Sequence, residues 1–205
     1  MADATGDLTA RLVRIVAGSP AFMAQLRAVR SLDLAAWCIG AGALRNLVWD
    51  HLQGHQEAAT PRDVDVAFFQ PRGAPARDER EVEAALQRLL PGVPWEGTDQ
   101  ARVHEWFEQV FGHAVPPLAS LEEAVGSWPE YATAVGVCLD ADDAVRVVAP
   151  HGLDDLFALR IRRNPARVSV ETYRQRAFEK LGLEHRSDLI RFALRAGILD
   201  DFKTP

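Results

Sequence analysis

A length of 205 residues, of which 48% are hydrophobic and 25% charged, is ordinary for a globular protein with a substantial buried core. No stretch approaches about 18 uninterrupted apolar residues, and residues 1–8 (MADATGDL) lack the basic and apolar parts of a secretory signal. We therefore expect a cytoplasmic protein without a membrane span. The formal net charge of −6 argues against strong bulk binding to nucleic acid, because such binding requires the neutralisation of many phosphates.

The sequence contains two cysteines, Cys38 and Cys138, and they form no Cys-x-x-Cys motif. This usage supports neither a disulfide framework nor a zinc cage. We expect both to be buried apolar thiols.

In chain order, the first 34 residues are expected to be helical. Residues 7–29 have apolar positions at helical spacing, and Gly18-Ser19-Pro20 interrupts them, which predicts two short amphipathic helices. A short apolar run at 35–39 then predicts a strand, which is followed by a glycine turn at 40–42 and a helix at 43–52.

The next segments alternate strand and helix patterns. Residues 63–69 predict a strand, 79–90 a charged amphipathic helix ended by Pro91-Gly92, and 93–97 a short edge strand. The remaining expected elements are a helix at 101–111, a capping box at 120–123 that begins a helix to 128, a hairpin of strands 133–139 and 145–149, and helices at 152–161, 169–181 and 187–196.

Asp63 and Asp65 begin the predicted strand 63–69 and are two positions apart. Side chains alternate between the two faces of a strand, so both carboxylates are expected on one face, with Val64 and Val66 on the other. Magnesium commonly takes one or two carboxylates and completes its octahedral shell with water and substrate phosphates. The pair is therefore a candidate metal site, although an isolated Asp-x-Asp pattern is more commonly two solvated acids.

The glycine turn upstream favours the metal-site interpretation of Asp63 and Asp65. Residues 40–42 lead directly into a helix whose first amide groups would face an anion. Gly42 and Ala43 would let a phosphate approach the backbone closely, and Arg45 and Asn46 would supply donors from the first helical turn. The alternative is that the glycines only permit tight packing.

Together these segments resemble the nucleotidyltransferase superfamily of the DNA polymerase β type, whose signature is a hydrophobic-Gly-Gly/Ser turn, a helix, and a strand with Asp-h-Asp/Glu-h. The counterparts here are residues 39–43 and 63–66, and GALRN at 42–46 is also similar to the Gly-x-h-Arg-Asp of tRNA CCA-adding enzymes. Over residues 35–180, the chain resembles more closely a bacterial family of nucleotidyltransferase-like proteins of unknown substrate. The blocks that carry this resemblance are AGALRNLVWD, RDVDVAFF, the WExxxQARVH region, SWPEYATAVGV and APHGLDDLFALRIRRNP.

The resemblance implies a third carboxylate on a neighbouring strand, which acts as the base or as a ligand for a second metal. Glu96 is the candidate, and a surface acid on an edge strand is the equally weighted alternative. Gln100, Arg102 and His104 follow in a shared block and are candidates for contact with nucleotide or acceptor. For Arg102 a salt bridge, and for His104 simple packing, would explain the residue equally well.

Three other functions are compatible with parts of the sequence. A dinucleotide-binding turn is disfavoured because Arg45 occupies the third-glycine position and because the acids begin their strand rather than end it. A zinc site at His51 and His55 is disfavoured by the intervening Gly54. A catalytically inactive nucleotide- or partner-binding module remains open, because Ala41 and Ala43 depart from the superfamily pattern.

We thus expect an α/β (α+β) protein with a minimal nucleotidyltransferase fold: a single domain with a mixed sheet flanked by helices. The core would span residues 35–150, preceded by helices in 1–34 and followed by a helical extension at 151–205. The implied reaction moves a nucleoside monophosphate from an NTP to an unidentified acceptor (a small molecule, protein or RNA) with Mg²⁺ or Mn²⁺ held by Asp63 and Asp65.

Overall fold

The computed structural model describes residues 4–55, 63–70, 77–105, 107 and 114–165. The chain divides into two compact units, residues 1–167 and 168–205, and all the described residues belong to the first. The helices expected at 169–181 and 187–196 lie outside the described residues. No helix in the described part is both long enough and apolar enough to cross a membrane.

Two helices open the chain, as the periodicity predicted: α1 (Ala4–Ala17) and α2 (Pro20–Arg30). The break between them has a clear local cause. Ser19 caps α2, because its hydroxyl accepts a hydrogen bond from the backbone N–H of Phe22 at 3.3 Å. Pro20 occupies the first helical position, where its missing N–H costs nothing.

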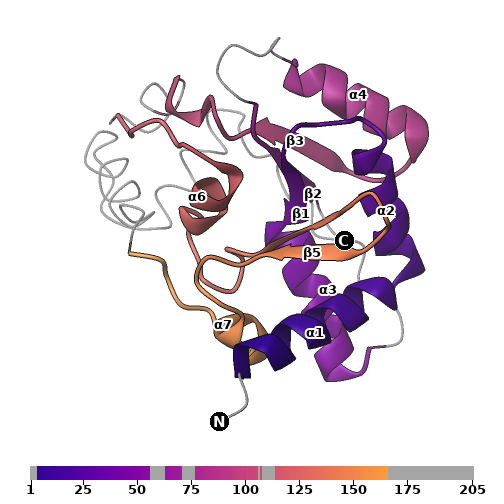
Figure 1. Cartoon of the computed structure of the whole chain (residues 1–205), viewed down its shortest axis with the longest axis vertical. Helices are drawn as coiled ribbons and strands as arrows, with labels where there is room; N and C mark the ends of the chain where they lie inside the picture. Colours follow the sequence, from indigo (N-terminus) through magenta and orange to yellow (C-terminus); the bar gives the residue numbers. More distant parts are fainter. Residues whose placement is uncertain (1–3, 56–62, 71–76, 106, 108–113, 166–205) are drawn as a thin grey trace, which may run out of the picture. The chain divides into compact units, whose positions relative to one another are not determined.

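A five-stranded sheet forms the centre of the fold (Figure 1). Its strands are β1 (Trp37–Gly40), β2 (Val64–Phe68), β3 (Trp95–Asp99), β4 (Gly136–Leu139) and β5 (Val145–Val148), in the order β3-β2-β1-β4-β5. Strands β2 and β3 are parallel, and the other neighbours are antiparallel, so the predicted mixed sheet is confirmed. The parallel pair requires a crossover, which helix α4 (Glu79–Leu89) supplies.

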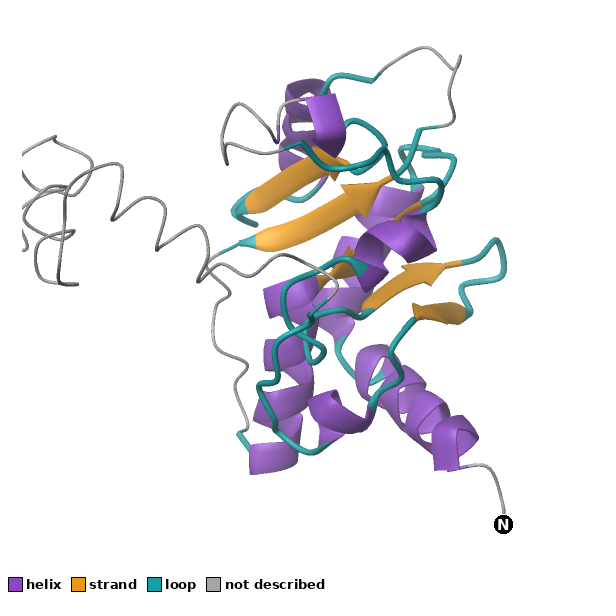
Figure 2. Cartoon of the chain, turned by 90° about the vertical axis from the view of Figure 1, so that its left-hand side faces the viewer, coloured by secondary structure: helices purple, strands orange, loops and turns teal. Residues whose placement is uncertain are grey.

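The two faces of the sheet have different environments. Val64, Val66 and Phe68 of β2 belong to the main core, where helices α1, α2, α3 (Ala41–Gln53) and α4 pack against the sheet. The opposite face is covered only in part, by the short helix α6 (Leu121–Gly126) and by Trp128, which pack on β1 and β2 in a second, smaller cluster. Figure 2 shows the same strands from the side.

The glutamates of α4 cover the free edge of β3. Glu83 Oε1 accepts a hydrogen bond from the N–H of Gly97 at 2.9 Å, and Glu79 Oε1 accepts one from the N–H of Asp99 at 2.7 Å. An uncovered edge strand would invite pairing with another chain. The edge position agrees with the sequence prediction, and the strand begins two residues later than expected because Val93 and Pro94 lead into it.

The hairpin of β4 and β5 is confirmed, and the capping box begins α6 as predicted. Ser120 Oγ accepts from the N–H of Glu123 at 3.1 Å, while the Glu123 carboxylate accepts from the N–H of Ala119 at 2.6 Å. Of the helix expected at 101–111, residues 103–105 are helical, and residues 106 and 108–113 lie outside the described part.

The helix predicted at 152–161 is wrong beyond its first turn. Helix α7 (Asp154–Phe157) is only four residues long, and Leu159 has a positive φ of 53°. The buried carboxylate of Asp155 accepts from Arg162 Nε at 2.8 Å and lies 3.7 Å from Arg160. These arginines turn the chain back toward Asp155, so the helix cannot continue.

Both cysteines are free thiols. Cys38 is buried, as expected, whereas Cys138 is only partly buried. Burial raises the pKa of the Cys38 thiol far above its usual range.

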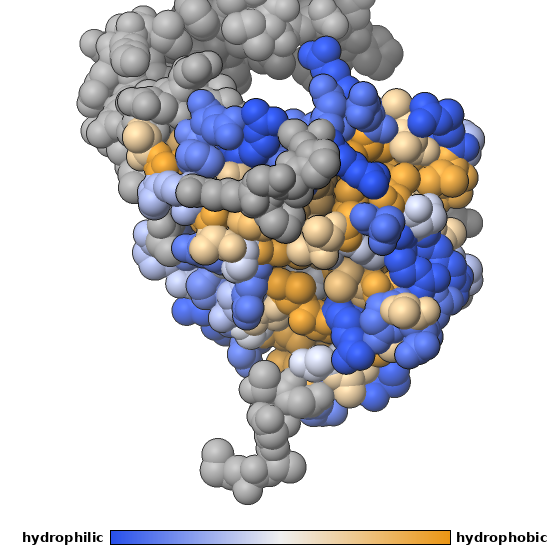
Figure 3. All heavy atoms as spheres, turned by 45° about the horizontal axis from the view of Figure 1, so that its top comes forward, coloured by the Kyte–Doolittle hydropathy of each residue, from blue (hydrophilic) through white to orange (hydrophobic). Residues whose placement is uncertain are grey.

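At the surface, Figure 3 shows hydrophobic and hydrophilic residues intermixed on the face that it displays.

Candidate active site

Asp65 lies on β2 and faces the partly covered side of the sheet. Its neighbours Val64 and Val66 are buried in the main core on the other side, so the predicted division of the strand into two faces is confirmed. Asp63 immediately precedes β2 and is exposed, whereas Asp65 is half-buried. The acidic pair therefore opens onto solvent at the start of a central strand.

Glu96 lies directly beside Asp65. The two residues are register partners in the parallel pair β2–β3, and partners in a ladder project to the same face. The pKa of Asp65 is raised from 3.8 to about 6, chiefly by burial and then by the negative charges of Asp63 and Glu96. The backbone N–H of Gly42 opposes this rise. Three carboxylates thus gather at one point on the sheet.

Burial, together with the negative charges of Asp63 and Glu96, should make ionised Asp65 unfavourable for stability at neutral pH. Because folding raises its pKa, the contribution of Asp65 to stability is complete below about pH 4 and is lost as the pH rises through about 6. We expect Asp65→Asn to increase the free energy of unfolding at pH 7.5, without divalent metal, by about 1–2 kcal/mol, since partial exposure screens the full effect. Urea denaturation at pH 7.5 and 4.5 measures this.

The matched control for this variant is Asp142→Asn, which alters an exposed turn. At pH 4.5 the gain from Asp65→Asn should become much smaller, because the folded carboxyl is then mostly protonated. An unchanged or lower stability at pH 7.5 would contradict the electrostatic description of the site.

The glycine turn has an unusual backbone. Ala41 has φ +49°, in the left-handed region that favours glycine, although the sequence places alanine there. Such residues cost about 1–3 kcal/mol and occur preferentially at functional sites. Gly40 is needed for packing, since a Cβ would lie 2.7 Å from the Trp128 ring, whereas a Cβ at Gly42 would come only within 3.9 Å of Asp63 Oδ1. Gly42 therefore leaves open space toward the acids.

A groove of about 200 Å³ is lined by two of the three carboxylates, those of Asp65 and Glu96. One side is the sheet, which contributes Asp65, Glu96, Thr98 and Gln100, and the other is a wall that includes Trp128 and Thr133. Asp65, Glu96 and Gln100 were predicted from the sequence, whereas the wall was not. The only signal for the wall was the SWPEYATAVGV block, because a tryptophan after a short helix predicts packing as readily as a binding surface.

Arg45 and Asn46 are held together at the start of α3. Arg45 donates to Asn46 Oδ1 at 3.1 Å, lies 5.1 Å from the ring centroid of Trp49, and is 3.7 Å from the Glu130 carboxylate. Glu130 belongs to the wall segment. The ion pair of Arg45 with Glu130 therefore connects α3, the helix that is a candidate for phosphate binding, to the wall. The side chain of Ala43 is buried in the main core, which leaves only its backbone for contact with a nucleotide.

Arg102 does not reach the groove. Its guanidinium pairs with Glu105 at 2.8 Å and borders a separate hollow of about 480 Å³ with Arg77 and Asp99. The local ion pair, three residues along the chain, explains this placement. His104 also lies elsewhere, at a larger cavity described below.

The model of the nucleotidyltransferase family matches residues 27–189 of this chain. The chain belongs to the nucleotidyltransferase family. A solved structure with a TM-score of 0.66 and 27% sequence identity is an NMR structure described as revealing a CCA-adding enzyme head domain. That match covers 80% of this chain and 85% of the other. No curated protein matches the chain. The mixed sheet with its helices is accordingly the fold of a nucleotidyltransferase head domain.

The donor set of this nucleotidyltransferase suits a divalent ion that is bound together with its substrate. Within the described residues, no group of three or more His, Cys, Asp or Glu side chains is arranged to hold a metal by itself. Magnesium does not require such a group, because one or two carboxylates suffice when substrate phosphates complete the shell. Asp63 and Asp65 offer these oxygens, and a cation would relieve the charge that raises the pKa of Asp65.

The wall is supported from behind by residues 162–164. The backbone N–H of Tyr131 donates to the carbonyl of Arg162 at 3.0 Å, and that of Asn164 donates to the carbonyl of Pro129 at 2.8 Å. The buried side chain of Asn164 also donates to the carbonyls of Gly126 at 2.6 Å and Trp128 at 3.0 Å. These bonds hold the segment that contains Trp128 in place over the sheet.

Proposed function

We propose that this nucleotidyltransferase moves a nucleoside monophosphate from an NTP to an acceptor hydroxyl, using Mg²⁺ or Mn²⁺ held by Asp63 and Asp65. The observation that supports this most strongly is the register of Asp65 with Glu96, which puts two carboxylates side by side on the open face of the sheet, within the electrostatic influence of Asp63. The family match gives the reaction class, nucleotidyl transfer. The metal, the roles of the residues and the acceptor are our proposal.

In the proposed reaction, Glu96 accepts the proton of the acceptor hydroxyl as its oxygen forms a bond to the α-phosphorus. The bond from the α-phosphorus to the bridging oxygen breaks, and pyrophosphate leaves with the electron pair. The bound metal supplies neutralisation of the negative charge on the phosphates and the attacking oxygen. Asp63, immediately before β2, and Asp65, on β2, would hold the metal at the edge of the groove.

The turn and first helical turn of α3 are proposed to bind the triphosphate. The backbone at Gly42 is open toward the acids, and amides at a helix N-terminus attract anions. Arg45 and Asn46 would add charged and polar donors from the same turn. Gln100 also lines the groove and is proposed to contact the sugar or the base.

The test is to incubate the protein with each of the four α-labelled NTPs, Mg²⁺ or Mn²⁺, and a cell extract. We expect label to move from at least one NTP to another species only when divalent metal is present, with release of unlabelled pyrophosphate. The control is the same protein with EDTA. Metal-independent labelling, or no metal-dependent binding of any NTP, would contradict the proposal.

A further inference from the structure

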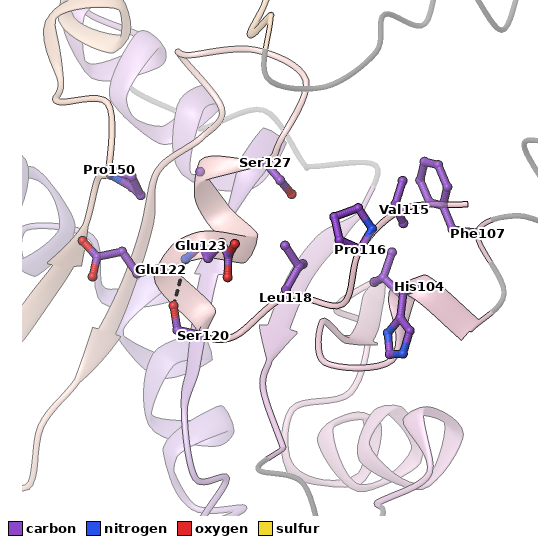
Figure 4. A pocket seen from close by; sticks show the side chains of 12 residues that line it. His104, Phe107, Val115, Pro116, Leu118, Ser120, Glu122, Glu123, Ser127 and Pro150 are labelled. Atoms are coloured by element: carbon purple, nitrogen blue, oxygen red, sulfur yellow. Dashed lines mark hydrogen bonds between the residues drawn. The ribbon is translucent and has the colours of Figure 1, made fainter. Parts of the chain in front are cut away.

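A second cavity, larger than the groove over the acids, lies beside α6 and has a volume of about 620 Å³. This volume is in the range of sites for small organic molecules. Its walls are mostly apolar: Val103, Phe107, Val115, Pro116, Leu118 and Pro150. Figure 4 shows side chains of α6 on one side and those of Val115, Pro116 and Phe107 on the other, with Leu118 between them.

The walls of this cavity continue those of the groove. Ser127 lines the cavity and Trp128 lines the groove, and consecutive Cα atoms are only about 3.8 Å apart. On the other side, Gln100 lines the groove, while Val103 and His104, a few residues along, line the cavity. The cavity and the groove over Asp65 and Glu96 are therefore lined by neighbouring segments of the chain.

The polar groups of the cavity indicate which chemistry it accepts. The ionisable side chains that line it are His104, Glu122 and Glu123, and no lysine or arginine is among its described lining residues. An anionic ligand would meet repulsion, whereas a neutral or cationic one would not. His104 lines the cavity, and its buried Nδ1 has no hydrogen-bond partner among the described residues.

We propose that this cavity is the acceptor subsite and that the acceptor is a small neutral or cationic alcohol with an apolar body. This inference rests on the proposed function. The apolar part of the acceptor lies between Leu118 and Phe107, and its hydroxyl extends past Ser127 and Trp128 to the groove. There the hydroxyl oxygen bonds to the α-phosphorus, its proton passes to Glu96, and pyrophosphate leaves with the electron pair of the broken bond.

The test fills the cavity and measures three properties. Leu118→Phe narrows it, and Leu89→Phe is the matched control on an exposed position of α4. Glu122→Lys reverses the charge at the rim without changing the apolar walls, and Glu81→Lys, on the exposed side of α4, is its control. The readouts are fluorescence of the neutral probe N-phenyl-1-naphthylamine, calorimetric binding of MgATP, and transfer of label from NTP into the extract fraction below 1 kDa.

We expect the wild type and both controls to bind the probe and to label a product in the small-molecule fraction. Leu118→Phe should weaken probe binding and lower transfer by at least about tenfold, with MgATP affinity unchanged. Glu122→Lys, which keeps the cavity intact, should lower transfer to a cationic acceptor while the probe still binds.

Several results would overturn the acceptor subsite. These are transfer by both Leu118→Phe and Glu122→Lys at the wild-type rate, label that enters only RNA or protein, or a wild type that does not bind the probe. A wild type that binds no NTP and transfers no label would instead refute the proposed function itself. Because MgATP binding is measured separately, the two failures are distinguishable.

Discussion

Replacement of Glu96 by glutamine should lower nucleotidyl transfer by about 10²–10⁴-fold and leave the affinity for MgATP nearly unchanged. Glu96 is the register partner of Asp65, is exposed and lines the groove. Glutamine keeps the size of the side chain but cannot take a proton. An interaction needed only in the transition state affects the rate and not ground-state binding.

The measurements for this variant are single-turnover transfer from labelled NTP and calorimetry with MgATP. Glu81→Gln is the control, because it makes the same chemical change on an exposed position of α4. A wild-type rate in Glu96→Gln would show that Glu96 is not the base. Tight MgATP binding without any transfer by the wild type would favour the inactive binding module over the enzyme.

The double replacement Asp63→Asn with Asp65→Asn should abolish magnesium-dependent NTP binding, with a loss of affinity of at least about 100-fold. Loss of residues that only orient metal ligands already costs about 10–100-fold, and this variant removes the ligands themselves. The fold should remain intact, since Asp63 is exposed and Asp65 is only half-buried. Relief of the repulsion around Asp65 also favours the folded state.

Calorimetry with ATP and with GTP at fixed magnesium tests the double variant, and circular dichroism checks its fold. The control is Glu81→Gln with Asp142→Asn, which removes two exposed charges from residues that do not line the groove. Unchanged NTP affinity in the Asp63/Asp65 variant would refute the metal-site assignment. A folded variant that loses binding only when magnesium is present would support it.

The sequence was sufficient for those parts of the site that depend on local patterns. Alternation along β2 placed Val64 and Val66 in the core and Asp65 on the open face. The glycine turn and α3 followed from apolar periodicity after a short strand. In these cases a period of two or of 3.6 residues decides which side chains share a face.

Other parts depended on long-range contacts. The register of Glu96 with Asp65 is set by the α4 crossover and by the bonds from Glu79 and Glu83 to β3, and no local pattern encodes it. The wall at Trp128 depends on Asn164, 36 residues along the chain. Position 41 also differs from a local rule, since an alanine there adopts a left-handed backbone.

Arginines were the least predictable residues. Arg45 lies near the start of α3, as the sequence predicted, but its ion-pair partner Glu130 belongs to a segment distant in sequence, which the sequence did not predict. Arg102 was a candidate for contact with nucleotide or acceptor, with a salt bridge as the alternative, and the structure shows it paired with Glu105. A long charged side chain can reach any of several partners, so its sequence position fixes its location only loosely.

The most direct test of the central claim is a crystal structure with Mn²⁺ and a non-hydrolysable NTP analogue, in which the anomalous signal locates the metal. We expect the metal about 2.1 Å from carboxylate oxygens of Asp63 and Asp65. The α-phosphorus should lie in the groove between Glu96 and Trp128. Metal and triphosphate bound elsewhere, for example in the hollow bordered by Arg77 and Arg102, would contradict the claim.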